Sequence, residues 1–130
     1  HIIMSRVVEI TDIEELEKIT KKYPSNLIII DFSASWCMPC QTIKPIFAEL
    51  SQKYENCIFL KVDVDEADEL MDFFGPESLP TFILMKNGKA FHKWSGADQD
   101  TLKRNVEKYM NFDVSELEEE ENKEQSNVDV

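Results

Sequence analysis

The stretch LIIIDFSASWCMPC, residues 27–40, decides the fold of this 130-residue chain. Its first half is a continuous apolar run rich in β-branched residues, the pattern of a strand that is buried on both faces. Its second half places Cys37 and Cys40 where such a strand gives way to a helix, which we expect to extend to about Tyr54. The stretch therefore predicts a strand-to-helix unit in a sheet that is covered on both sides.

The two cysteines lie where that helix begins. Unpaired backbone N–H groups and the helix dipole at a helix N-terminus favour a thiolate over a thiol, so Cys37 is expected to be the nucleophile. Cys40 lies about one helical turn inward, close enough to attack a mixed disulfide at Cys37 as the resolving thiol. The pattern predicts thiol–disulfide exchange.

Outward from this stretch, strands and helices alternate along the chain. The first helix should begin at a capping box of Thr11 and Glu14. Asn87-Gly88 favours a hairpin turn because both residues tolerate positive φ. Strands are expected over 6–10, 27–32, 57–64, 81–85 and 90–94, and helices over 13–19, 37–54, 67–74 and 98–109. This order, βαβαβαββα, predicts an α/β protein with a central mixed sheet flanked by helices on both faces.

Composition and charge divide the chain into a body and a tail. The size fits one domain, which we place at residues 5–112, and His1-Ile2-Ile3 before Met4 is interpreted as an expression remnant before the start methionine. Residues 113–130 hold eight acids and one lysine, so they carry −7 of the net −12. We expect a solvated, disordered tail, with partner docking as the less favoured alternative. The negative charge disfavours nucleic-acid binding.

The third cysteine and the flanking sequences bear on compartment and metal binding. One CxxC pair plus a lone Cys57 does not resemble a secreted disulfide framework, so the pair is either catalytic or metal-binding. Zinc would need two further ligands, and His1, Cys57 and His92 are scattered. Cys57 is expected to be a buried free thiol, with a regulatory role as the alternative. Without a membrane span or signal pattern, a cytoplasmic location, with the nucleus as the alternative, is expected.

From about Val7 to Tyr109 the chain resembles the thioredoxin family, and most of all its eukaryotic cytosolic type. A lone CxxC motif is a weak signal, but an ordered set of matching stretches is a strong one. These stretches are Asp31–Cys37, Pro39–Cys40, Lys44–Pro45, Val62–Asp65, Leu79–Phe82, Lys86–Gly88 and Ser95–Ala97. Met38 and Gln41 depart from the glycine and lysine usual in the family, and we expect them to alter the redox potential or reductase recognition.

The resemblance implies a site at the ends of the central strands and the activity of a protein-disulfide reductase. Electrons would come from NADPH through thioredoxin reductase, with no bound cofactor. The implied substrates are peroxiredoxin, ribonucleotide reductase and methionine sulfoxide reductase, and the protein is expected to be a monomer. Two alternatives stay open, namely a more oxidising isomerase or oxidase, and a binding module that uses the same surface and the tail.

Asp31 interrupts an apolar strand, where an ionised carboxylate is costly. Its pKa should therefore be raised, which would let it exchange a proton with Cys40. Lys61 on the adjacent strand could instead neutralise Asp31, or could tune it as an acid, and the two interpretations are compatible.

A docking surface for substrates is also expected. By its residues alone Pro80 fits a trans proline at a strand start, whereas the resemblance implies a cis Leu79–Pro80 bond that faces the sulfurs. The backbone of Leu79 would then be free to pair with an extended substrate segment. The expected surface consists of Trp36, Met38, Pro39, Leu79, Pro80, Gly96 and Ala97.

Overall fold

The computed structural model describes residues 4–112, which form a five-stranded sheet with the order β1-β3-β2-β4-β5. Strands β1, β3 and β2 are parallel, whereas β4 runs antiparallel to β2 and β5 antiparallel to β4. The predicted mixed sheet is confirmed. The strands are β1 (Val8–Glu9), β2 (Ile28–Ser33), β3 (Ile58–Asp63), β4 (Thr81–Lys86) and β5 (Lys89–Ser95).

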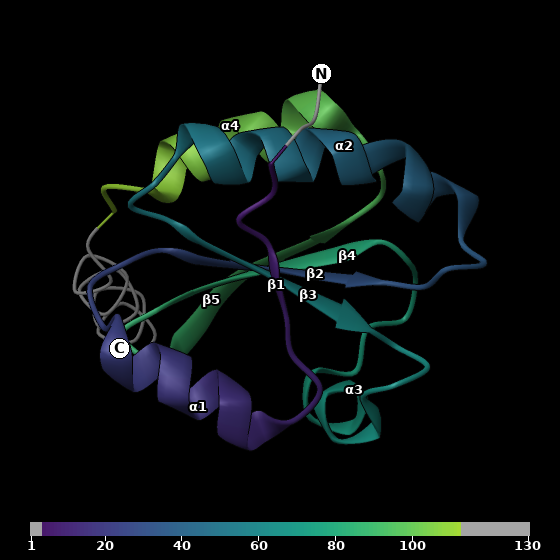
Figure 1. The fold of residues 1–130 in the computed structure, drawn as a ribbon, viewed down its shortest axis with the longest axis horizontal. Helices are drawn as coiled ribbons and strands as arrows, with labels where there is room; N and C mark the ends of the chain where they lie inside the picture. Colours follow the sequence, from purple (N-terminus) through teal and green to yellow (C-terminus); the bar gives the residue numbers. More distant parts are fainter. Residues whose placement is uncertain (1–3, 113–130) are drawn as a thin grey trace, which may run out of the picture.

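Four helices cover this sheet. Figure 1 shows α2 and α4 along one face and α1 and α3 along the other. The predicted order βαβαβαββα and the placement of helices on both faces are therefore confirmed. The helices are α1 (Ile13–Lys22), α2 (Met38–Lys53), α3 (Asp68–Phe74) and α4 (Gln99–Tyr109).

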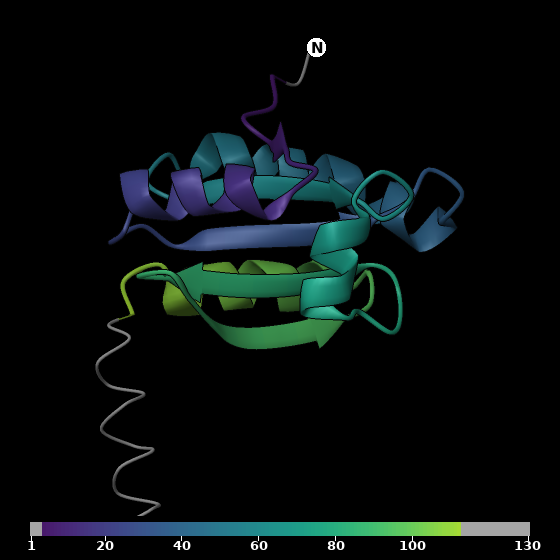
Figure 2. The same cartoon turned by 90° about the horizontal axis from the view of Figure 1, so that it is seen from below.

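The core forms around β2, which lies in the middle of the sheet (Figure 2) and is buried along its whole length. Alternate residues of β2 point to opposite faces, so Ile28 and Ile30 pack on the side of α1 and α3 while Ile29 packs on the side of α2 and α4. Burial on both faces is what the apolar run predicts. The large apolar side chains buried in this core include Phe32, Phe47, Leu50, Phe59, Phe82 and Leu84.

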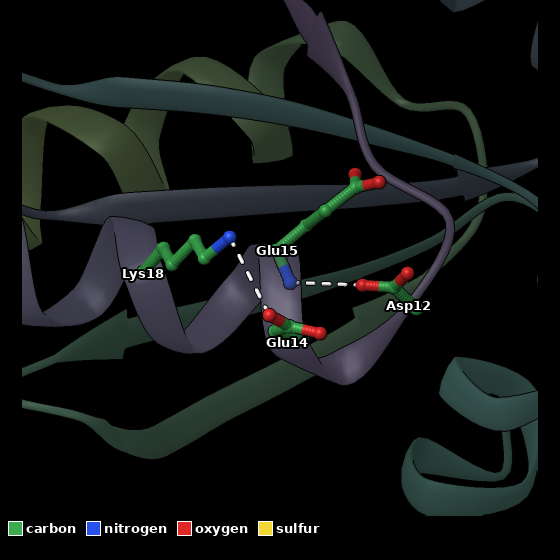
Figure 3. Close-up of polar contacts among 4 residues, drawn as sticks. All are labelled: Asp12, Glu14, Glu15 and Lys18. Carbon is green, nitrogen blue, oxygen red and sulfur yellow. Dashed lines mark hydrogen bonds and ion pairs between the residues drawn. The ribbon is translucent and has the colours of Figure 1, made fainter.

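The start of α1 differs from the prediction by one residue. Asp12, not Thr11, caps the helix, and its Oδ1 accepts a hydrogen bond from the backbone N–H of Glu15 at 2.8 Å (Figure 3). The carboxylate of Glu15 in turn accepts from the N–H of Thr11. The predicted Glu14 instead pairs with Lys18 on the exposed surface. Both Thr11 and Asp12 are good capping residues with a glutamate three positions on, so sequence alone could not separate them.

The first strand is also shorter than the prediction of residues 6–10. It lies at the edge of the sheet and pairs with β3 through Val8 and Glu9 alone, with one further hydrogen bond from the N–H of Ile10 to the carbonyl of Lys61. An edge strand has a partner on one side, so its length is set by that partner as well as by its own sequence.

The pairing of the strands brings three chain segments to one end of the sheet. Phe32, near the end of β2, pairs with Thr81 at the start of β4, and Thr81 also pairs with Ser95 at the end of β5. The loop from β2 to α2 therefore lies beside the segments that precede β4 and follow β5, at the end where α2 begins (Figure 1). Among residues 4–112, no helix is both long and apolar enough to cross a membrane.

Candidate active site

Cys37 is the N-cap of α2, and its disulfide to Cys40 closes the first turn of the helix, with 5.3 Å between the Cα atoms. Its Sγ accepts a hydrogen bond from the backbone N–H of Cys40 at 3.3 Å. Pro39 fits this first turn because its missing N–H would have no partner there. Once the bond is reduced, the same N–H and the helix dipole favour the thiolate of Cys37.

The two cysteines are largely covered, whereas their neighbours are not. Cys37 is 6% exposed and Cys40 2% exposed, while Trp36 is 68% and Met38 74% exposed. The indole Nε1 of Trp36 donates a hydrogen bond to Oδ2 of Asp65 at 2.8 Å, which fixes the exposed ring. Exposed apolar side chains thus flank a largely covered pair of sulfurs.

Residues far along the chain complete this surface. Leu79 packs against the buried cluster of Ala34, Cys37 and Cys40. The Leu79–Pro80 peptide bond is cis, and the carbonyl of Pro80 accepts a hydrogen bond from the N–H of Gly96 at 2.9 Å. Gly96 has a φ of +105°, a conformation that favours glycine. Ala97 is half-buried against the core on the α2 and α4 side, so it lies at the margin of this group.

Asp31 lies buried on β2, six positions before Cys37 in the sequence. Desolvation by burial raises its pKa to about 7, while the nearby cation of Lys61 acts in the opposite direction. The two residues face each other in register on β2 and β3, as predicted, but no ion pair within 4.0 Å joins them among residues 4–112. The Oδ1 atom of Asp31 has no hydrogen-bond partner in this part of the chain. Asp31 is thus a carboxyl that can both hold and release a proton near neutral pH.

A cavity of about 340 Å³ lies between Asp31 and Cys40. Asp31 and Cys40 both line it, together with Ser33 and the lysines Lys44 and Lys61. Apolar atoms form most of its wall, which explains the desolvation of Asp31. Asp31 and Cys40 therefore face the same cavity.

Several contacts at the site were not predicted from the sequence. Asp65, the partner of Trp36, lies 29 positions away, and Lys44 reaches the cavity from the second turn of α2. Both belong to stretches that match the family, which was the available signal. Gln41 lines the cavity and donates from Nε2 to the carbonyl of Ala34 at 3.2 Å, which ties α2 to the loop before it.

Cys57 is a buried free thiol, as predicted. It packs in the core on the α2 and α4 side, and burial raises its pKa to about 11, with Lys86 acting in the opposite direction. Among the described residues, no group of three or more His, Cys, Asp and Glu side chains is arranged to hold a metal ion.

Comparisons with known proteins agree with this geometry. The thioredoxin family model matches residues 7–108. A thioredoxin of Ophiophagus hannah is 37% identical over 99 residues, covering 76% of this chain and 94% of that protein. Thioredoxin-1 of Caenorhabditis elegans is 40% identical over 92 residues, covering 71% and 80%. The solved thioredoxin of Fasciola hepatica superposes with a TM-score of 0.77 at 31% identity, covering 78% of this chain and 98% of that one.

Thioredoxins exchange a dithiol for a disulfide without a bound cofactor, and NADPH enters only through their reductase. Their partners are therefore disulfide-containing proteins and that reductase. The disulfide-bonded Cys37–Cys40 pair stands in the position that this chemistry requires. The chain belongs to the thioredoxin family, and it is a thiol–disulfide oxidoreductase.

Proposed function

We propose that Cys37 is the attacking thiol, Cys40 the resolving thiol and Asp31 the proton acceptor of a protein-disulfide reductase. The observation that carries this assignment is the position of the pair, with Cys37 capping α2 and Cys40 on the wall of the cavity that Asp31 also lines. This arrangement gives the two sulfurs different surroundings. The exposed apolar residues lie beside Cys37, and the titratable carboxyl lies on the side of Cys40.

The reaction proceeds in two exchanges. The thiolate of Cys37 attacks one sulfur of a substrate disulfide, so that a mixed disulfide forms and one substrate thiolate leaves and takes up a proton. Cys40 then loses its proton and attacks the Sγ of Cys37, which forms the Cys37–Cys40 disulfide and releases the second substrate thiolate. Two electrons pass from the dithiol to the substrate, and the reductase returns them from NADPH.

Asp31 takes the proton of Cys40 in the second exchange. A pKa of about 7 suits this step, because a base works best when its pKa is near the working pH. Lys61 pairs in register with Asp31 and tunes it, because its cation favours the ionised carboxylate.

Substrates dock on the surface around Cys37. We assign to it Trp36, Met38, Pro39, Leu79, Pro80, Gly96 and Ala97. Trp36, Met38, Pro39 and Gly96 are exposed, whereas Leu79 and Ala97 are half-buried and Pro80 is buried. We name peroxiredoxin, ribonucleotide reductase and methionine sulfoxide reductase as substrates, and thioredoxin reductase as the electron donor. We also propose that the protein is a monomer. A location in the cytoplasm, with the nucleus as a second location, fits the cysteine usage.

Trapping tests the assignment of the two thiols. Reduced Cys40→Ser protein, mixed with peroxiredoxin in its disulfide form, should accumulate a mixed disulfide because the second exchange is blocked. The matched Cys37→Ser protein should accumulate none, because Cys40 is covered and lacks the position at the helix end. If the Cys37→Ser protein traps the substrate as well as the Cys40→Ser protein does, the roles are wrong.

A further inference from the structure

Met38 is the most exposed sulfur in the active site. Met38 is 74% exposed, compared with 6% and 2% for Cys37 and Cys40. Among the described methionines, Met85 is buried, Met71 and Met110 are half-buried, and Met4 is 73% exposed but lies at the N-terminal end of the described chain. An oxidant that approaches the site from solvent therefore meets the thioether of Met38 before either cysteine.

The disulfide state removes the competing sulfurs. With Cys37 and Cys40 bonded to each other, neither offers a thiolate to a peroxide. The remaining thiol, Cys57, is buried in the core, and burial keeps it protonated at neutral pH. The accessible nucleophilic sulfur near the docking surface is then the Sδ of Met38.

We propose that Met38 is a peroxide-reactive modification site, whose oxidation in the disulfide state lowers the affinity of the active site for its protein substrates. Hydrogen peroxide transfers one oxygen atom to Sδ, the sulfur loses two electrons to the O–O bond, and water leaves. The product is methionine sulfoxide, which is reversible by methionine sulfoxide reductases.

The effect of the sulfoxide follows from where Met38 lies. It occupies the first position of α2, in sequence between Trp36 and Cys40 and exposed like Trp36. Oxidation replaces a flexible apolar group by a polar one, so that a substrate must bury a strong hydrogen-bond acceptor in order to reach Cys37. The inference rests on the proposed docking surface. It adds to the proposed function that substrate binding weakens under one condition. Met38 is oxidised when the reductase is limiting and the disulfide state of the protein persists.

The test begins with the full chain in its disulfide form, treated with hydrogen peroxide. After the peroxide is removed, the protein is digested and each methionine is examined by mass spectrometry. A second portion is reduced briefly with dithiothreitol, which restores the cysteines but leaves the sulfoxide, and its rate of insulin reduction is divided by the rate of untreated protein. The rate at which the untreated protein reduces insulin tests the proposed function independently of this inference.

We expect Met38 to be oxidised at least as fast as Met4 and well before Met85. The insulin-reduction rate of the treated protein should be about one-fifth of the untreated rate. The Met38→Leu protein should keep a ratio near one, whereas Met4→Leu should lose activity like the wild type. Purified methionine sulfoxide reductase should restore the wild-type rate. The inference is overturned if Met4 is oxidised while Met38 is not, if oxidised Met38 leaves the ratio unchanged, or if Met38→Leu loses as much as the wild type.

Discussion

The cysteines of this chain lie at opposite ends of two parallel strands. Cys37 and Cys40 follow the carboxyl end of β2, where the chain turns into α2, whereas Cys57 precedes the amino end of β3. At the carboxyl end of β2, the N–H of Cys40 donates a hydrogen bond to the Sγ of Cys37, and the carboxyl of Asp31 lines the same cavity as Cys40. At the other end, the thiol packs among apolar side chains, and its pKa is raised to about 11.

The comparison teaches that reactivity comes from the surroundings rather than from the residue type. A thiol becomes a nucleophile where fixed dipoles stabilise the thiolate and one side stays open to a substrate. The same thiol is inert where burial penalises its charge. The following experiments break or sharpen this contrast, beginning with the largest effect.

Removing one thiol at each end should have opposite consequences. Cys37→Ser is expected to reduce insulin disulfides no faster than the uncatalysed background, because a serine hydroxyl does not attack a disulfide. Cys57→Ser should keep the wild-type rate but lose about 1–2 kcal/mol of unfolding free energy, since its hydroxyl is buried in an apolar cluster. Equal losses of activity in the two proteins would remove the distinction between the two ends.

Alkylation should separate the two ends by rate. In the reduced protein at pH 7, iodoacetamide should modify Cys37 at least about 100-fold faster than Cys57. With a pKa of about 11, Cys57 holds roughly one thiolate in 10⁴ molecules at this pH. The rates are read from tryptic peptides by mass spectrometry. In urea the two thiols should react at similar rates, and a difference that persists there would not come from the fold.

Asp31→Asn should change how stability depends on pH. The pKa of Asp31 rises from 3.8 to about 7 on folding, so the folded protein binds this proton more tightly than the unfolded chain. The wild type is therefore most stabilised by Asp31 below about pH 4, and loses that stability as the pH rises towards 7. Asparagine does not titrate.

The free energy of unfolding of Asp31→Asn, measured with urea and taken relative to the wild type, should thus increase by about 2–3 kcal/mol between pH 5 and pH 8. The same protein should resolve the mixed disulfide more slowly, because Cys40 has lost its proton acceptor. Asp72→Asn, on the exposed surface of α3, serves as the control and should show the wild-type pH dependence. A constant difference between Asp31→Asn and the wild type would mean that Asp31 does not titrate near pH 7.

The smallest effect is expected for Lys61→Met. Loss of the Lys61 cation removes the charge that favours ionised Asp31, so the pKa of Asp31 should rise further. The variant should therefore lose the stability contributed by protonated Asp31 at a higher pH than the wild type does. Lys93→Met, on the exposed surface of β5, offers a matched loss of charge away from the cavity. A shift of equal size in both proteins would reflect net charge rather than a contact between the two strands.

The fold could be predicted to the level of its elements because hydrophobic period differs between strands and helices. The run at residues 27–32 identified the central strand. In α4, the buried residues Leu102 and Val106 stand four positions apart, as the helical period requires. The exact ends of elements that depend on contacts with other segments could not be predicted from the sequence. The length of β1 is limited by its pairing with β3, and Asp12 caps α1 although Thr11 is an equally suitable capping residue. The expected domain limits remain predictions, and the expected tail lies outside the described residues.

For the candidate site, the sequence was most informative where the chemistry is local. Cys37, Cys40 and Asp31 stand within ten residues, on a strand and helix that the pattern defines. Leu79 and Gly96 came from the family resemblance, since nothing local marks them. Asp65 and Lys44 could not be assigned roles, because their contacts arise only when β3 and α2 are packed beside the loop. The effect of Met38 and Gln41 on redox potential stays a prediction.

An equilibrium redox titration of the Cys37–Cys40 pair tests the central claim most directly. The protein is equilibrated with mixtures of reduced and oxidised dithiothreitol, and the tryptophan fluorescence reports the state of the pair. The account predicts a midpoint near about −270 mV, the value general to thioredoxin, which suits a donor of electrons to protein disulfides. A midpoint near about −180 mV, in the range of protein disulfide isomerase, would contradict it.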